Sequence, residues 1–294
     1  MAAVVLAAAG SAVALAACSL IPSTSGSPTA TVNAIEQILG HAPTGVAARI
    51  QKQGQIVIAN DADYPPQSYM EDGQLVGFDV DVGKKVAELL GVQAKFVNPT
   101  WAAVPLGLRN GRFDVSIGSL TRTADHRTQM GLADPYYYAQ SQVVVRQGAP
   151  LLATVDSLQG KQIGAGVATT YQTYLQAVGG VGIVTYGTSA SALRALASGR
   201  LDGVMTADLT AAPVIAKGKR LQLSGQAFYY EALCFATRKG EADLLALLDY
   251  AVKKMRKDGS LTAMAKQWYG FDVSQPPAAG VPEFEDAIVQ LTVQ

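Results

Sequence analysis

The strongest constraint on the fold is a regular alternation of strand-like and helical segments that starts near residue 50. Short apolar runs such as Gln55–Asn60 and Asp202–Thr206 have the length and composition of buried strands. They alternate with segments of helical periodicity, as in Phe78–Leu90, where apolar residues recur on one face and Gly91 follows as a stop signal. Such units predict a largely parallel sheet with helices on both faces. The series runs twice, which predicts two α/β lobes.

Composition narrows the classes of function. The chain has 294 residues, about two domains, and 49% are hydrophobic, so a large core is expected rather than disorder. Lys plus Arg and Asp plus Glu each number 23, and a neutral chain argues against a nucleic-acid partner. Two cysteines and two histidines are too few for a four-thiolate zinc site or a multi-histidine metal site. We therefore expect no metal and no cofactor.

The N-terminus has the pattern of an exported, lipid-anchored protein. Residues 1–17 are apolar and uncharged, as in the core of a signal peptide. The segment Leu15-Ala16-Ala17-Cys18 resembles the lipobox of bacterial lipoproteins, and a Ser/Thr/Pro/Gly-rich stretch suited to a flexible tether follows. No Lys or Arg precedes Cys18, so the alternative is an uncleaved apolar helix with an incidental cysteine. Cys234 lies in a strand-like run and is expected to be a buried thiol.

A series of short motifs carries a family resemblance. In chain order they are Asp61–Pro66, Tyr69–Asp81, Trp101 with Gly111–Val115, Gly118–Thr123 with Ala133–Tyr136, Leu158–Lys161 with Ala168–Tyr171, Ala197–Asp202, and Asp258–Leu261 with Trp268–Gly270. Because these motifs occur in this order, the chain resembles the bacterial extracellular solute-binding proteins of the amino-acid-binding type. These proteins are the capture subunits of ATP-driven importers. The resemblance spans about residues 50–272.

The resemblance implies a periplasmic-binding-protein-like fold. Two βα lobes, each with helices on both faces of its sheet, are joined by strand crossings near Tyr138–Val145 and Phe228–Cys234, and the ligand lies in the cleft between them. The implied division is a signal peptide at 1–17, a lipid-anchored tether and extension at 18–48, lobe 1 at 49–140, lobe 2 at 141–230, a return to lobe 1 at 231–275 and a tail at 276–294. Hinge motion would close the cleft.

The resemblance also implies how an amino acid's two charged groups are held. Thr170 matches a position that meets the ligand carboxylate, and Thr169-Thr170 opens a predicted helix, whose N-terminal amides suit an anion. Thr169 is equally explained as an ordinary helix cap. Gly118, Ser119 and Thr121 match the segment that meets the ammonium group, although they also suit a polar loop after a strand.

Aromatic and acidic residues are expected around the rest of the ligand. Tyr64 and Trp101 match the aromatic positions that flank it. Asp61 matches a position that faces the ligand side chain, and Asp63 is close by. Acids beside aromatics favour a cationic or amide side chain, and the alternative is a pair of solvated turn residues.

Two anchors of the family are displaced in this chain. The family usually has an Arg five residues after the position of Thr121; here His126 stands there, and Arg127 follows. A shift of one residue rotates a helical side chain by roughly 100°, so Arg127 needs a local bulge to substitute, and Arg122 is a third candidate. Asp208 likewise lies one residue beyond the acidic position of the family. Loss of both anchors would open the site to ligands other than α-amino acids.

The predicted function is therefore extracytoplasmic capture of a small polar solute, first of all a polar or basic amino acid. A monomer would deliver it to the membrane permease of an ATP-driven importer. Two alternatives stay open. One is a dehydratase-like enzyme on the same scaffold, with His126 as the acid; Glu231 is another acidic candidate, whose location the sequence does not give. The other is a ligand sensor for a membrane receptor.

Overall fold

The computed structural model describes residues 29–218, 220–277 and 279–293. The expected signal peptide and Cys18 lie outside these residues. Within the described chain, nine strands form one mixed sheet in the order β10-β9-β11-β8-β12-β6-β1-β5, with β7 beside β12. The strands are β1 (Gln55–Ala59), β5 (Gln93–Val97), β6 (Val115–Thr121), β7 (Met130–Leu132), β8 (Tyr137–Arg146), β9 (Gln162–Gly166), β10 (Gly182–Tyr186), β11 (Gly203–Ala207) and β12 (Leu221–Arg238).

Helices cover the sheet, and a small second sheet lies apart from it. The small sheet consists of β2 (Asp63–Tyr64), β3 (Ser68–Glu71) and β4 (Gln74–Val76). The helices are α1 (Thr29–Leu39), α2 (Gly45–Gln53), α3 (Phe78–Leu90), α4 (Val104–Arg109), α5 (Ala124–Gln129), α6 (Thr170–Val178), α7 (Ser189–Ala197), α8 (Asp208–Ala216), α9 (Ala242–Lys257), α10 (Ser260–Tyr269) and α11 (Phe284–Val293), with short 3-10 turns η1 (Trp101–Ala103) and η2 (Asp156–Leu158).

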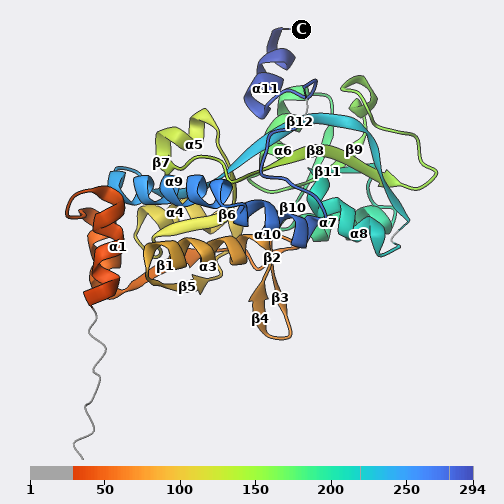
Figure 1. Ribbon diagram of the computed structural model, residues 1–294. Helices are drawn as coiled ribbons and strands as arrows, with labels where there is room; N and C mark the ends of the chain where they lie inside the picture. The colour runs from red at the N-terminus through yellow and green to blue at the C-terminus, as the bar shows by residue number, and fades with distance from the viewer. Residues whose placement is uncertain (1–28, 219, 278, 294) are drawn as a thin grey trace, which may run out of the picture.

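The sheet divides the molecule into the two expected lobes. In lobe 1, β1 pairs parallel with β5 and β6; in lobe 2, β9 pairs parallel with β10 and β11. The long strands β8 and β12 pair antiparallel with each other and pass from one lobe to the other (Figure 1). The sheet is therefore parallel within each lobe and mixed as a whole, because these two strands carry the chain across and back.

Strand alternation distributes side chains between the two faces of the sheet. In β12, Leu233 and Phe235 are buried with α3 and α9 in one cluster, whereas Cys234 and Ala236 are buried with α4 in another. This is the period of two that a strand imposes on its side chains. Cys234 is fully buried, as expected, and its thiol lies 3.4 Å from the Leu120 carbonyl oxygen.

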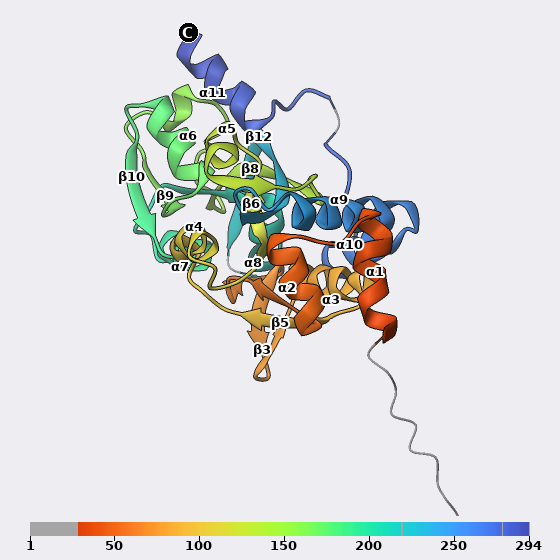
Figure 2. The same cartoon turned by 90° about the vertical axis from the view of Figure 1, so that its left-hand side faces the viewer.

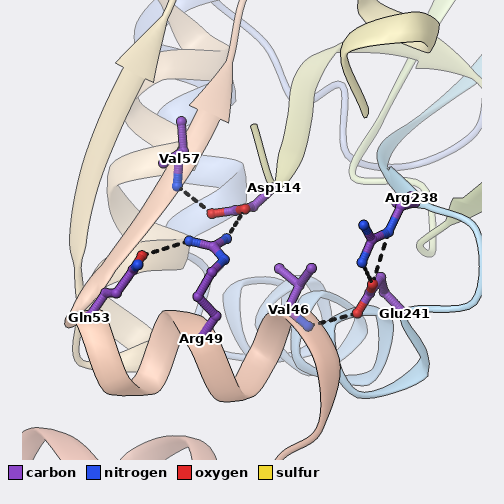
Figure 3. Close-up of polar contacts among 7 residues, drawn as sticks. All are labelled: Val46, Arg49, Gln53, Val57, Asp114, Arg238 and Glu241. Atoms are coloured by element: carbon purple, nitrogen blue, oxygen red, sulfur yellow. Dashed lines mark hydrogen bonds and ion pairs between the residues drawn. The ribbon is translucent and has the colours of Figure 1, made fainter. Parts of the chain in front are cut away.

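The N-terminal extension is helical from Thr29 onward, so α2 runs through the expected start of lobe 1 at residue 49. Figure 3 shows how α2 is held on lobe 1: the Arg49 guanidinium contacts the carboxylate of Asp114 and, at 2.7 Å, the Gln53 side-chain oxygen. The other Asp114 oxygen accepts the Val57 N–H at 2.8 Å. Because Val57 lies in β1, this pair joins α2 to the sheet.

The C-terminal tail also folds onto the molecule. Helix α11 lies against α6 of lobe 2, at the end of the molecule far from α1 (Figure 2). Phe284 packs edge-on against Tyr229 with ring centroids 5.2 Å apart. Glu285 accepts the Ala124 N–H and lies 3.1 Å from the Arg127 guanidinium on α5. No helix of the described chain is both long enough and apolar enough to span a membrane.

Candidate functional site

A cavity of about 70 Å³ lies between the lobes, where the chain leaves the strands of each sheet half. Lobe 1 contributes the loop after β1, the turn η1 and the end of β6. Lobe 2 contributes the loop from β9 into α6 and the start of α7. The crossing strand β12 supplies Glu231 and Leu233. The crossing strand β8 contributes Tyr137 and Ala139, so the cavity is built from both lobes and from both of the strands that join them.

All but two of the predicted ligand-facing residues line this cavity. They are Asp61, Tyr64, Trp101, Gly118, Ser119, Thr121, His126, Thr169 and Thr170. They lie on both sides of the cleft, in segments more than 100 residues apart in sequence. Thr169 also caps α6, with its hydroxyl 3.4 Å from the Gln172 N–H, so its interpretation as a helix cap is confirmed.

The structure does not bring Arg127 and Asp208 to the cavity. The Arg127 guanidinium points toward Glu285 and the Arg122 carbonyl, and its side chain is 46% exposed. The Asp208 carboxylate accepts the backbone N–H groups of Gln140 at 3.0 Å and Leu209 at 2.8 Å. No bulge compensates for the one-residue displacement of Arg127, so its side chain points away from the cleft while that of His126 faces it.

Glu231 is the buried acid of the site, and the sequence did not reveal its place. One of its carboxylate oxygens accepts the hydroxyls of Thr121 at 2.6 Å and Thr170 at 2.5 Å, and the other accepts the Tyr171 phenol at 2.6 Å. Thr121 belongs to lobe 1, whereas Thr170 and Tyr171 open α6 in lobe 2, so one carboxylate ties the lobes together. Burial raises the pKa of Glu231, and the three hydroxyls and nearby His126 oppose that rise.

A signal for Glu231 was nevertheless present in the sequence. It is the only acidic residue in the run Tyr229–Thr237, which is otherwise apolar or weakly polar and strand-like. A charged residue within a buried strand is rare unless it is paired or functional. That argument identifies the residue as unusual but does not say which cavity it faces.

His126 is held in one orientation at the cavity wall. Its ring Nδ1 lies 2.8 Å from the Thr121 carbonyl oxygen. Because a carbonyl only accepts hydrogen bonds, Nδ1 carries the proton, and Nε2 is an acceptor in the neutral ring or a donor in the imidazolium. The Thr123 hydroxyl caps α5 by accepting the His126 N–H at 3.1 Å.

A second layer of polar groups supports the first. Ser119 has a positive φ of 62°, and its hydroxyl donates to Asp79 at 2.9 Å while accepting the Tyr137 phenol at 2.5 Å. The Tyr136 phenol donates to the other Asp79 oxygen at 2.6 Å. Asp79 is fully buried, and burial raises its pKa to about 7. The left-handed backbone at Ser119 is therefore maintained by a buried network directly behind the cavity.

The cleft is closed in this structure. The Trp101 indole N–H of lobe 1 donates to the Ala168 carbonyl of lobe 2 at 3.1 Å. Asp61 sits nearby in a turn, where its carboxylate accepts the Asp63 N–H at 3.0 Å and burial raises its pKa. In this closed form Glu231, Thr121 and Thr170 are buried, and removal from water strengthens their interaction with a charged ligand.

Two α/β lobes joined by crossing strands, with a closed polar cavity between them, define a two-lobed binding protein. Comparison with known proteins agrees with that class. The family model of bacterial extracellular solute-binding proteins, family 3, matches residues 56–271, so the chain belongs to this family.

Particular relatives match across most of their length. The L-cystine-binding protein TcyJ of Escherichia coli strain K12 is 32% identical over 80% of this chain and 90% of its own. The histidine-binding periplasmic protein of the same strain is 31% identical over 74% of this chain and 88% of its own. Among solved structures, the ancestral amino acid-binding protein AncCDT-1, described as a precursor of cyclohexadienyl dehydratase, matches 77% of this chain and 100% of its own with 28% identity and a TM-score of 0.71.

Proposed function

We propose that this protein captures a small solute bearing an ammonium group outside the cytoplasm and delivers it to the permease of an ATP-driven importer. Polar and basic amino acids are the first candidates. The main support for this proposal is the closed cavity, whose lining combines acids, hydroxyls and aromatic rings from both lobes. Two relatives are named for binding cystine and histidine, both of which carry ammonium groups. In this proposal a lipid on Cys18 keeps the monomeric protein at the membrane.

Thermal unfolding tests the capture function. The full chain, purified in mild detergent, is heated with a panel of amino acids, amines and small carboxylates. A ligand present at a hundredfold its dissociation constant adds about 2.7 kcal/mol to the free energy of unfolding. For a chain of this size that corresponds to roughly 5–10 °C in Tm. A shift limited to a few ammonium compounds supports the proposal, and no shift with any compound of the panel contradicts it.

The proposal also states that the solute is released unchanged. The ancestral neighbour described as a precursor of a dehydratase makes turnover worth testing directly. Incubation of each stabilising compound with the protein, followed by NMR of the compound, is expected to return it intact. Appearance of a dehydrated product that requires His126 would instead support the enzyme alternative.

A further inference from the structure

We propose, building on the capture of an ammonium-bearing solute, that the carboxylate of Glu231 binds the positive group of the ligand, and that the ligand is an amine that does not need an α-carboxylate. This goes beyond the proposed function because it sets the class of solute. It also assigns a role to a side chain that bridges the two lobes.

The charges around the cavity favour a cation. Among the described residues of its lining, Glu231, Asp61 and Asp63 are acidic, and His126 is the only side chain able to carry positive charge. The nearby guanidinium groups are outside it: Arg127 pairs with Glu285, and Arg122 faces Asp134 at 3.9 Å. A ligand carboxylate would be buried beside like charges and without Arg or Lys, which is costly in a site closed to water.

Three hydroxyl donors of the cavity are already committed to Glu231. A hydroxyl has a single O–H to donate. Those of Thr121, Thr170 and Tyr171 donate to Glu231 at 2.5–2.6 Å. A ligand carboxylate at the start of α6 would therefore have to displace the carboxylate that the protein itself places there. Glu231 thus takes up three hydroxyl donors that an anionic ligand group would otherwise use.

Glu231 still has acceptor capacity for a cation. A carboxylate has about four acceptor positions, and three are used here. Its second oxygen accepts only the Tyr171 phenol among the hydrogen bonds of the described residues, so an ammonium or amidinium N–H can add to it. Tyr64 and Trp101 line the same cavity, and their ring faces suit both a methylene chain and a positive charge. Asp61 offers a second acid for a diamine.

Matched ligand pairs test the inference on the wild-type chain. Calorimetry compares arginine with agmatine, lysine with cadaverine and histidine with histamine, because the members of each pair differ only in the α-carboxylate. We expect at least one amine to bind tenfold or more tightly than its parent amino acid. Tighter binding of the amino acid in every pair that binds overturns the inference and leaves the capture function standing. Binding of neither member of any pair also overturns the inference, whereas the capture function is overturned only if no compound of the wider thermal-unfolding panel binds.

A variant without the negative charge tests whether the Glu231 carboxylate binds the amine. Glu231→Gln keeps the shape and one acceptor oxygen, and we expect it to weaken amine binding by at least tenfold. Glu88→Gln is the matched control, because Glu88 is exposed on α3 and forms only a surface pair with Lys85; it is expected to leave binding unchanged. Thermal unfolding of both variants checks that they fold. Undiminished amine binding by a folded Glu231→Gln protein would overturn the role of this carboxylate.

Discussion

At the scale of single residues, Asp79 shows how burial changes the meaning of a sequence position. In the sequence it is an acid in the first turn of a helix, where a negative charge is ordinarily favourable and solvated. In the structure it is fully buried behind the cavity, bonded to Ser119 and Tyr136, and its pKa is about 7. Its protonation state is therefore linked to folding near neutral pH.

The sign of this linkage follows from the raised pKa. Between about pH 4 and pH 7 the folded protein retains a proton on Asp79 that the unfolded chain has released. Stability contributed by this group is therefore lost as pH rises through that window. The amide of Asp79→Asn cannot ionise. The free energy of unfolding of this variant minus that of wild type should therefore increase by about 2–4 kcal/mol as the pH rises from 4 to 8. Urea unfolding of both proteins at several pH values measures it.

The control is Asp72→Asn in the exposed turn between β3 and β4, where Asn also tolerates the positive φ of 49°. The difference in free energy of unfolding between this variant and wild type is the baseline for the Asp79→Asn comparison. A pH-independent difference between Asp79→Asn and wild type would show that Asp79 ionises as an ordinary surface acid.

At the scale of elements, the Arg49–Asp114 ion pair helps to attach α2 to lobe 1, together with the Glu241 carboxylate, which accepts the Val46 N–H at 2.8 Å. The Arg49 side chain is 37% exposed and that of Asp114 only 5%, so removal of the guanidinium leaves a nearly buried carboxylate with the Val57 N–H as its remaining hydrogen-bond donor (Figure 3). The helix precedes the segment matched by the family, residues 56–271. It is thus an addition to the lobe, held by contacts of its own.

Arg49→Met keeps the aliphatic stem and removes the charge. We expect it to lower the free energy of unfolding by about 1–3 kcal/mol, because it leaves a buried acid unpaired, and to increase amide exchange over residues 45–53. Urea unfolding and hydrogen exchange provide the measurements. Arg109→Met, at an exposed position at the end of α4, is the matched control and should change little. Equal effects of the two variants would contradict the role assigned to the pair.

At the scale of the whole molecule, hydrogen bonds made by Trp101, Glu231 and Glu285 link the lobes. Trp101 bonds across the cleft to Ala168, Glu231 bonds to hydroxyls of both lobes, and Glu285 of α11 reaches α5 of lobe 1 while its helix packs on lobe 2. Each of these contacts depends on the relative position of the lobes. Hinge opening would break those that cross the cleft, so they contribute to the free energy of closure.

Trp101→Phe removes the bond across the cleft and keeps an aromatic ring. A neutral hydrogen bond contributes about 0.5–1.5 kcal/mol net, so ligand affinity should fall roughly 2–10-fold, and the radius of gyration of the unliganded protein should increase. Calorimetry and small-angle X-ray scattering measure these effects. Trp268→Phe removes an equivalent bond within lobe 1, to Asp81 at 2.9 Å, and should leave the radius of gyration unchanged. An equal increase in the two variants would contradict the closing role of Trp101.

The sequence by itself determined what depends on neighbours along the chain. The periods of apolar residues specified most of the strands and helices, Gly91 ended α3 with a left-handed φ of 67°, and Thr123 and Thr169 cap the helices that follow them. Such features depend on backbone geometry within a few residues. The ordered motifs went further and indicated most of the residues that line the cavity.

Only the tertiary structure decided which side chains meet. Thr121 and Glu231, which share a hydrogen bond, are 110 residues apart in the sequence. A one-residue change in helical position turned Arg127 outward and His126 inward, and no local pattern shows whether a bulge will correct such a shift. The buried states of Asp79 and Glu231 likewise come from strands and helices that pack around them from distant parts of the chain. Local periodicity therefore specified the elements, and the charge of the cavity emerged only from their assembly.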